Sequence, residues 1–240
     1  MVQIEKSMQK LVSKGKLEES HMTSALQSLS TSESLECLRE TDYAIEAVPE
    51  VESLKAGILK TADSLLPAHA VLASNTSSIS ITRLAAATQR PSQVIGLHFM
   101  NPVPLMALIE LVRGMQTSEE TFKTSQALAK LMGKQTCVSQ DRPGFIVNRI
   151  LMPMINEAFY TLSEGVASPE DIDLGMKLGT NQPMGPLALA DLIGLDTCHS
   201  IMEVLYTGLG RDKYAPCPLL RTYVDAGWLG RKTGRGVYKY

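Results

Sequence analysis

Hydrophobic and polar residues follow each other along the first 140 residues in a pattern that predicts helices separated by short buried strands. Apolar residues recur every three or four positions over residues 1–11, which predicts a helix at the start of the chain with no capping residue before it. A short apolar run predicts a strand over residues 26–31, and an acidic helical stretch follows it. The chain therefore starts with helical elements and then enters a strand-containing region.

Strands and helices alternate from residue 43 onward. The predicted strands cover residues 43–48, 70–73 and 94–97, and the helices between them cover 53–66 and 81–88. This spacing is typical of βαβ units in a parallel sheet. The apolar run 105–112 follows too closely for a helical crossover, so we expect it to return antiparallel. A capping-box pattern then predicts a helix over 119–132, with a last strand over 136–139.

The pattern becomes helical after residue 144. Long apolar-faced helices are predicted over 145–163 and 187–205, and Ser168 followed by Pro169 marks the start of another helix between them. The predicted fold is therefore α/β, with an α/β domain over residues 1–141 and an all-helical domain over residues 142–240.

Composition excludes several classes of function. The chain has 240 residues, 44% of them hydrophobic and 20% charged, and its net charge is −2. This balance does not favour nucleic acid or an anionic membrane as a partner. Four cysteines form no CxxC pair, so we expect no metal site and a reducing compartment. No apolar run is long enough to cross a membrane. We expect a soluble intracellular protein, cytoplasmic unless incomplete termini hide a peroxisomal or mitochondrial signal.

Polar side chains follow three predicted strands at the points where the strands end. They are Glu46 and Glu50, the cluster 74–78, and His98 followed by Asn101. Ligands of open parallel sheets bind beyond the carboxyl ends of the strands. Each cluster alone is commonly a helix cap or a structural polar group, but their repetition at successive strand ends favours a binding site.

His98 and Glu110 lie symmetrically about Pro104. If the two flanking runs pair antiparallel around that proline, residues 98 and 110 lie opposite each other on one face of the sheet. A carboxylate beside an imidazole fixes its tautomer and raises its basicity, as a general base for an alcohol requires. The alternative is a structural cross-strand ion pair without a catalytic role.

Together these motifs resemble those of the 3-hydroxyacyl-CoA dehydrogenases, and within that family the 3-hydroxybutyryl-CoA dehydrogenases are most similar. The resemblance covers nearly the whole chain. The segments that carry it, in their order along the chain, are residues 44–50, 73–78, 96–102 with Glu110, 143–149, 171–186 and 230–234.

The resemblance implies NAD-dependent oxidation of short-chain L-3-hydroxyacyl-CoA to 3-oxoacyl-CoA, in fatty-acid or butanoate metabolism. It implies that His98 is the base, that Glu110 orients it, and that Ser77 and Asn148 complete the catalytic set by binding the substrate. It also implies a homodimer formed through the helical domain. The positions that it places near NAD are Glu50, Lys55, Asn101 and Lys232.

One part of the family pattern is not found. Family members begin with a strand, a Gly-x-Gly-x-x-Gly turn, a helix and a second strand, whereas Gly15 is the only glycine before Gly57 here. We therefore expect a partial Rossmann-type domain from an N-terminally truncated family member. Without the first strand, the strand at 43–48 would have an unpaired edge.

Two other functions remain open from the sequence. The first is a non-catalytic family member that binds acyl-CoA or dimerises, which the missing glycine-rich turn favours. The second is a related hydroxyacid dehydrogenase without CoA specificity. Those relatives usually rely on a lysine base, whereas His98 and Glu110 fill that role here.

Overall fold

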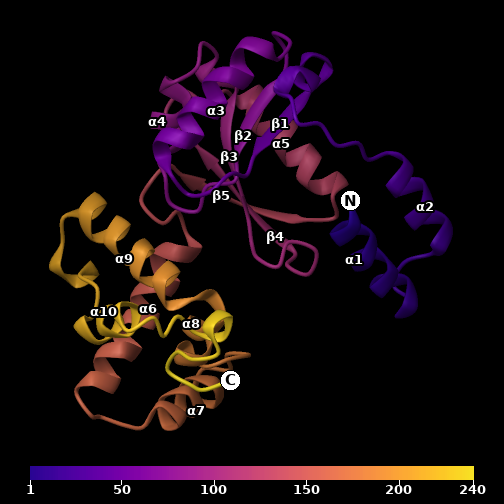
Figure 1. The fold of residues 1–240 in the computed structure, drawn as a ribbon. Helices are drawn as coiled ribbons and strands as arrows, with labels where there is room; N and C mark the ends of the chain where they lie inside the picture. The colour runs from indigo at the N-terminus through magenta and orange to yellow at the C-terminus, as the bar shows by residue number, and fades with distance from the viewer.

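The computed structural model describes residues 1–240 as an α/β layer followed by a separate group of helices. In Figure 1 the sheet and its helices form the upper part of the molecule, and the helices coloured orange to yellow form the lower part. The prediction of an α/β fold followed by a helical C-terminal part is confirmed.

The sheet has five strands in the order β1-β2-β3-β4-β5. The first three strands are parallel to one another, β4 returns antiparallel to β3, and β5 is parallel to β4. The antiparallel return follows the short connection after Phe99, as the sequence predicted. The strands are β1 (Tyr43–Glu46), β2 (Val71–Ser74), β3 (Val94–Phe99), β4 (Leu108–Arg113) and β5 (Gln135–Gln140).

Helices cover both faces of the sheet, and the strand residues alternate between two cores. In β2, Leu72 packs in the core beneath α3 and α4, whereas Val71 and Ala73 pack in the core that includes Ala129 of α5. Burial on both faces explains why β2 is uniformly apolar until Ser74. The elements of this part are η1 (Leu35–Glu40), α3 (Glu52–Leu65), α4 (Ile81–Ala86), η2 (Pro91–Gln93) and α5 (Glu119–Leu131).

The C-terminal helices enclose a core of their own. Phe159 and Leu205 are fully buried in it, and the Phe159 ring packs edge-on against Tyr223 with 6.1 Å between centroids. Figure 1 shows these helices grouped below the sheet. They are α6 (Val147–Ser163), α7 (Pro169–Gly179), α8 (Pro186–Ile193), α9 (Leu195–Leu209) and α10 (Pro218–Asp225), with the short turns η3 (Asp212–Tyr214) and η4 (Arg231–Thr233).

Two predictions about elements are wrong, and one helix was missed. The prediction of a strand at 26–31 is wrong, because Leu26 lies in the last turn of helix α2 (Glu19–Gln27) and the segment after the helix pairs with no strand. The single helix at 187–205 is two helices, because Gly194 adopts a φ of 105° and turns the chain between α8 and α9. Helix α10 was not predicted.

The N-terminal helices α1 (Val2–Ser13) and α2 contact each other and bury none of their residues. Figure 1 shows this pair standing apart from the sheet, beyond β1. Strand β1 pairs only with β2, so its other edge has no strand partner and Ile45 is 39% exposed. The unpaired edge of this strand was predicted from the sequence.

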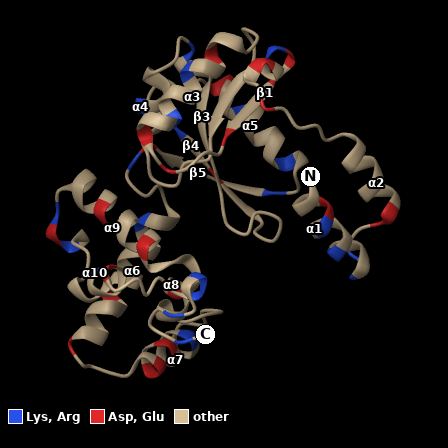
Figure 2. Ribbon diagram, viewed as in Figure 1, with Lys and Arg blue, Asp and Glu red and all other residues tan.

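Charged residues of both signs are interspersed over the helices, as Figure 2 shows. No helix in the structure combines the length and apolar character needed to cross a membrane.

Candidate active site

The sheet register places His98 of β3 directly opposite Glu110 of β4, as the symmetry about Pro104 predicted. The imidazole Nδ1 and the carboxylate Oε2 are 2.7 Å apart. His98 is 5% exposed and Glu110 is fully buried, so solvent screens this contact little. With Glu110 ionised, Nδ1 carries the proton it donates, and Nε2 keeps a free lone pair that can accept a proton.

The second oxygen of Glu110 holds the start of the helical domain. Oε1 accepts hydrogen bonds from the backbone N–H groups of Ile146 and Val147, at 3.0 and 3.1 Å. These groups belong to the first turn of α6, where N–H groups lack partners within the helix and the helix dipole favours a negative charge. The preceding residue, Phe145, has a positive φ of 49°, and its ring lies edge-on to His98 at 5.7 Å. One carboxylate therefore orients the imidazole and anchors α6.

Asn148, in the first turn of α6, faces the loop that follows β2. Its side-chain amide donates to the backbone carbonyl of Ser77 at 3.2 Å. The Ser77 hydroxyl makes no hydrogen bond within the protein, so it can bind another molecule. The four residues predicted as catalytic, His98, Glu110, Asn148 and Ser77, are thus linked through the first turn of α6.

Glu50 lies after β1 and holds the same loop. Its Oε1 accepts hydrogen bonds from the Thr76 hydroxyl at 2.6 Å, from the backbone N–H groups of Ser77 and Ser78 at 2.9 Å each, and from the Ser78 hydroxyl at 3.0 Å. Partial burial alone would raise the pKa of Glu50, but the Thr76 hydrogen bond and the nearby charge of Lys55 outweigh it and lower the pKa.

Lys55 is buried beneath Glu50. Its Nζ donates to Glu46 Oε1 at 2.8 Å and to the Val48 carbonyl at 2.9 Å, and it lies 3.4 Å from Glu50 Oε2. Glu46 is itself buried and accepts from the Ser74 hydroxyl at 2.6 Å. The sequence reasoning missed this network. A signal was available, because Lys55 lies four residues before the buried Leu59 on the same helix face, and a lysine there requires a buried partner.

Two residues predicted near the cofactor are not joined to this cluster. Asn101 is exposed in the connection after β3 and precedes a cis peptide bond at Pro102. Lys232, in η4, pairs with Asp196 at the start of α9, with 2.5 Å between Nζ and Oδ1. Both belong to elements other than those that hold His98.

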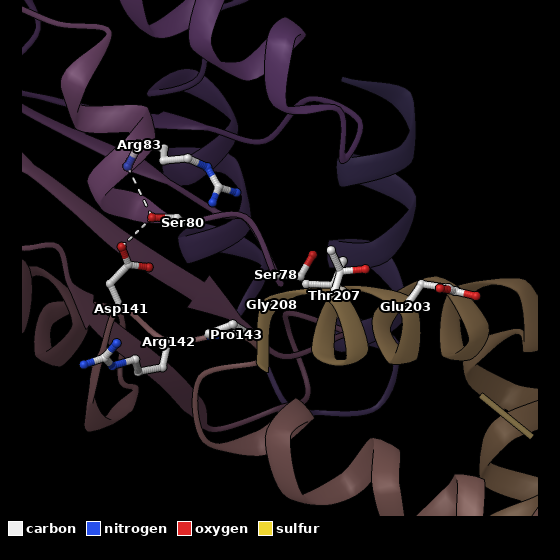
Figure 3. Close-up of a pocket in the computed structure, with 10 residues that line it drawn as sticks. Ser78, Ser80, Arg83, Asp141, Arg142, Pro143, Glu203, Thr207 and Gly208 are labelled. Atoms are coloured by element: carbon white, nitrogen blue, oxygen red, sulfur yellow. Dashed lines mark hydrogen bonds between the residues drawn. The ribbon is translucent and has the colours of Figure 1, made fainter. Parts of the chain in front are cut away.

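A cleft of about 520 Å³ lies between α4 and α9. Asp141, another residue whose role the sequence reasoning missed, caps α4 there by accepting from the backbone N–H groups of Ile81 and Thr82, at 3.0 and 2.8 Å. It also accepts from the Ser80 hydroxyl at 2.7 Å, and Figure 3 shows this bond. Neither His98 nor Ser77 lines this cleft. Its lining residues are Ser78, Ser80, Arg83, Asp141, Arg142, Pro143, Glu203, Val204, Thr207 and Gly208.

Comparison with known proteins decides the family. The model described as "3-hydroxyacyl-CoA dehydrogenase, NAD binding domain" matches residues 1–142, and that described as "3-hydroxyacyl-CoA dehydrogenase, C-terminal domain" matches residues 144–240. The chain belongs to the 3-hydroxyacyl-CoA dehydrogenase family. Because the NAD-binding model matches from residue 1, the prediction of a partial Rossmann domain is not confirmed.

Several 3-hydroxyacyl-CoA dehydrogenases resemble the chain over nearly its full length. A probable 3-hydroxybutyryl-CoA dehydrogenase of Bacillus subtilis is 56% identical over 99% of this chain and 83% of its own. The 3-hydroxybutyryl-CoA dehydrogenase of Bradyrhizobium diazoefficiens is 55% identical over 100% of this chain and 82% of its own. The crystal structure of (S)-3-hydroxybutyryl-CoA dehydrogenase from Ralstonia eutropha matches with a TM-score of 0.95 and 56% identity, over 98% of this chain and 83% of that one.

The structure fits one end of NAD, the cofactor of this family. The carboxyl ends of β1, β2 and β3 meet at the edge where Ser77 and His98 lie, which is where parallel sheets bind ligands. Glu50 Oε2 has only Lys55 near it, at 3.4 Å, so it can accept a hydrogen bond from a ribose hydroxyl. These side chains suit the nicotinamide riboside end, while residues 1–240 contain no glycine-rich turn for the pyrophosphate.

Proposed function

We propose that this protein catalyses the NAD-dependent interconversion of short-chain L-3-hydroxyacyl-CoA and 3-oxoacyl-CoA, with 3-hydroxybutyryl-CoA as the characteristic substrate. The observation that carries the proposal is the buried 2.7 Å contact between His98 Nδ1 and Glu110 Oε2, which leaves Nε2 as a proton acceptor. The identity to 3-hydroxybutyryl-CoA dehydrogenases over nearly the whole chain supports the choice of substrate.

The protein's own groups position the substrate and move one proton. His98 Nε2 takes the proton of the 3-hydroxyl while Nδ1–H stays hydrogen-bonded to Glu110, whose charge stabilises the imidazolium that forms. The free hydroxyl of Ser77 and the amide of Asn148 hold the substrate oxygens. NAD, when bound, accepts the hydride that leaves C3. In the reverse direction His98 returns the proton to the carbonyl oxygen.

On the cofactor side we propose different roles for the predicted residues. Glu50 Oε2 receives a ribose hydroxyl, whereas Lys55 has its Nζ occupied by buried acceptors and supports Glu50 instead of contacting NAD. Contacts of Asn101 and Lys232 with NAD stay predictions, since Lys232 Nζ pairs with Asp196 and neither residue joins the cluster around His98.

We also propose that two copies associate through the helical domain. The apolar stretch 187–205, from which the sequence suggested a dimer, is largely buried within its own domain. The most exposed apolar side chains of the helical domain lie outside this stretch, with Leu178 of α7 72% exposed and Ile150 of α6 68% exposed. Exposed apolar surface of this kind commonly marks an interface. Sedimentation velocity of the wild type and of Leu178→Lys tests this proposal, since a monomeric wild type would contradict it.

The catalytic proposal is tested by acetoacetyl-CoA-dependent oxidation of NADH by the purified chain. We expect turnover that prefers the four-carbon substrate, and the reverse reaction should use the L isomer of 3-hydroxybutyryl-CoA and not the D isomer. Calorimetric titration with acetoacetyl-CoA and with NAD accompanies the assay. Binding of acetoacetyl-CoA without turnover would instead favour a non-catalytic acyl-CoA-binding function.

A further inference from the structure

Glu50 has an environment that direct contact with a cofactor does not explain. All four hydrogen bonds to its Oε1 come from residues 76–78, the loop that carries the Ser77 hydroxyl. Hydrogen bonds to an ionised carboxylate are about twice as strong as neutral ones. A single oxygen therefore fixes the backbone on both sides of Ser77.

The loop held by Glu50 in turn receives Asn148. The Asn148 amide donates to the Ser77 carbonyl at 3.2 Å. Both residues are proposed to bind the substrate, so the position of the Asn148 amide depends on the backbone at Ser77. On the other side, Lys55 and Glu46 form a buried pair that supports Glu50 from below. Contacts thus run from Lys55 through Glu50 to Ser77 and Asn148.

We infer that Glu50 is a positioning residue that sets the Ser77 hydroxyl and the Asn148 amide for the acyl-CoA substrate. This role is separate from any contact of Glu50 with NAD, and it rests on the proposed function only in naming the substrate. Misplacing a substrate-orienting group by about 1 Å can cost about 10²-fold in rate, so a residue that prevents such a shift affects catalysis without touching the substrate.

Amide hydrogen exchange tests the structural half of the inference without any turnover. Glu50→Ala removes the acceptor of the Ser77 and Ser78 N–H groups, so these two amides should exchange at least about tenfold faster. Glu52→Gln is the matched control, because Glu52 lies two residues after Glu50 at the start of α3, pairs with the exposed Arg83, and makes no hydrogen bond to residues 76–78. Unchanged exchange at Ser77 and Ser78 in a folded Glu50→Ala protein would overturn the inference.

A double-mutant cycle on acetoacetyl-CoA binding tests the functional half. We expect Glu50→Ala to weaken binding about tenfold in the wild-type background and by less than about threefold when Ser77 is already alanine, since Glu50 acts through Ser77. Glu50→Gln, which retains one acceptor oxygen, should restore part of the affinity. Additive effects, or a loss confined to NADH binding, would overturn the inference.

Different results would contradict the proposed dehydrogenase function and the positioning role of Glu50. Absence of NADH oxidation by the wild type would contradict the proposed function, whereas the exchange rates and the binding cycle need no turnover. Circular dichroism melting of each variant separates a misplaced loop from a misfolded protein.

Discussion

Glu110→Gln is the substitution that separates a catalytic pair from a structural one. Glutamine has the shape of glutamate, but one of its two terminal groups is a donor. If its oxygen stays on the Ile146 and Val147 N–H groups, its NH₂ group faces His98 Nδ1. That arrangement forces the proton of the imidazole onto Nε2, which then no longer accepts a proton.

The expected magnitudes follow from these contacts. In a Ser-His-Asp triad the corresponding acid-to-amide change lowers kcat about 10⁴-fold through the wrong tautomer. We expect a loss of about 10³- to 10⁴-fold here. The charge also stabilises the first turn of α6, an effect worth about 0.3–1 kcal/mol and up to about 2 kcal/mol when partly buried. The free energy of unfolding should therefore fall by about 1–2 kcal/mol.

The assay is steady-state reduction of acetoacetyl-CoA with NADH, accompanied by urea unfolding. Glu119→Gln is the control, because Glu119 is exposed and pairs only with Arg113. A Glu110→Gln enzyme whose kcat stays within tenfold of wild type would refute the reasoning. The pair would then be a structural cross-strand contact.

Three further predictions concern packing and pH. A Cβ at Gly96 would lie 2.7 Å from Val112 Cβ, so Gly96→Ala should cost about 1–3 kcal/mol by urea unfolding; a change below 0.5 kcal/mol would contradict the packing. Phe159→Ala empties a fully buried site and should cost about 3–5 kcal/mol, seen as a lower denaturation midpoint. The pKa of Glu50 is lower in the folded protein than in the unfolded chain, so the ionised carboxylate stabilises the fold at pH values above the unfolded-state pKa. This stabilisation is lost as the pH falls through the folded-state pKa of Glu50. Glu50→Gln should flatten the acid side of the stability curve, and an unchanged slope would contradict this assignment.

The sequence predicted the sheet well because its strands are short apolar runs separated by helices. The register of His98 and Glu110 followed from the position of Pro104 alone, since an antiparallel pair must be symmetric about its turn. The two wrong predictions concern features that apolar periodicity does not show. Residues 26–31 have no strand beside them with which to pair. Gly194 divides the helix at 187–205 through its positive φ, which apolar periodicity does not reveal.

The site was only partly visible in the sequence. Ser77 and Asn148 were found because the family motifs mark them, whereas His98 and Glu110 were also indicated by their symmetry about Pro104. The supports behind them were missed, because Glu46 and Lys55 lie within apolar patterns and their pairing depends on how β1 and α3 pack. The second contact of Glu110, with the first turn of α6, joins residues 36 positions apart and required the fold.

The central claim is that His98, held by Glu110, is the proton acceptor for an acyl-CoA alcohol. It is tested most directly by comparing wild type and His98→Gln in the oxidation of L-3-hydroxybutyryl-CoA with saturating NAD, with acetoacetyl-CoA affinity measured in parallel. The account predicts a fall in kcat of about 10²- to 10⁴-fold while affinity changes by less than about threefold. A His98→Gln protein that retains the wild-type kcat would contradict it.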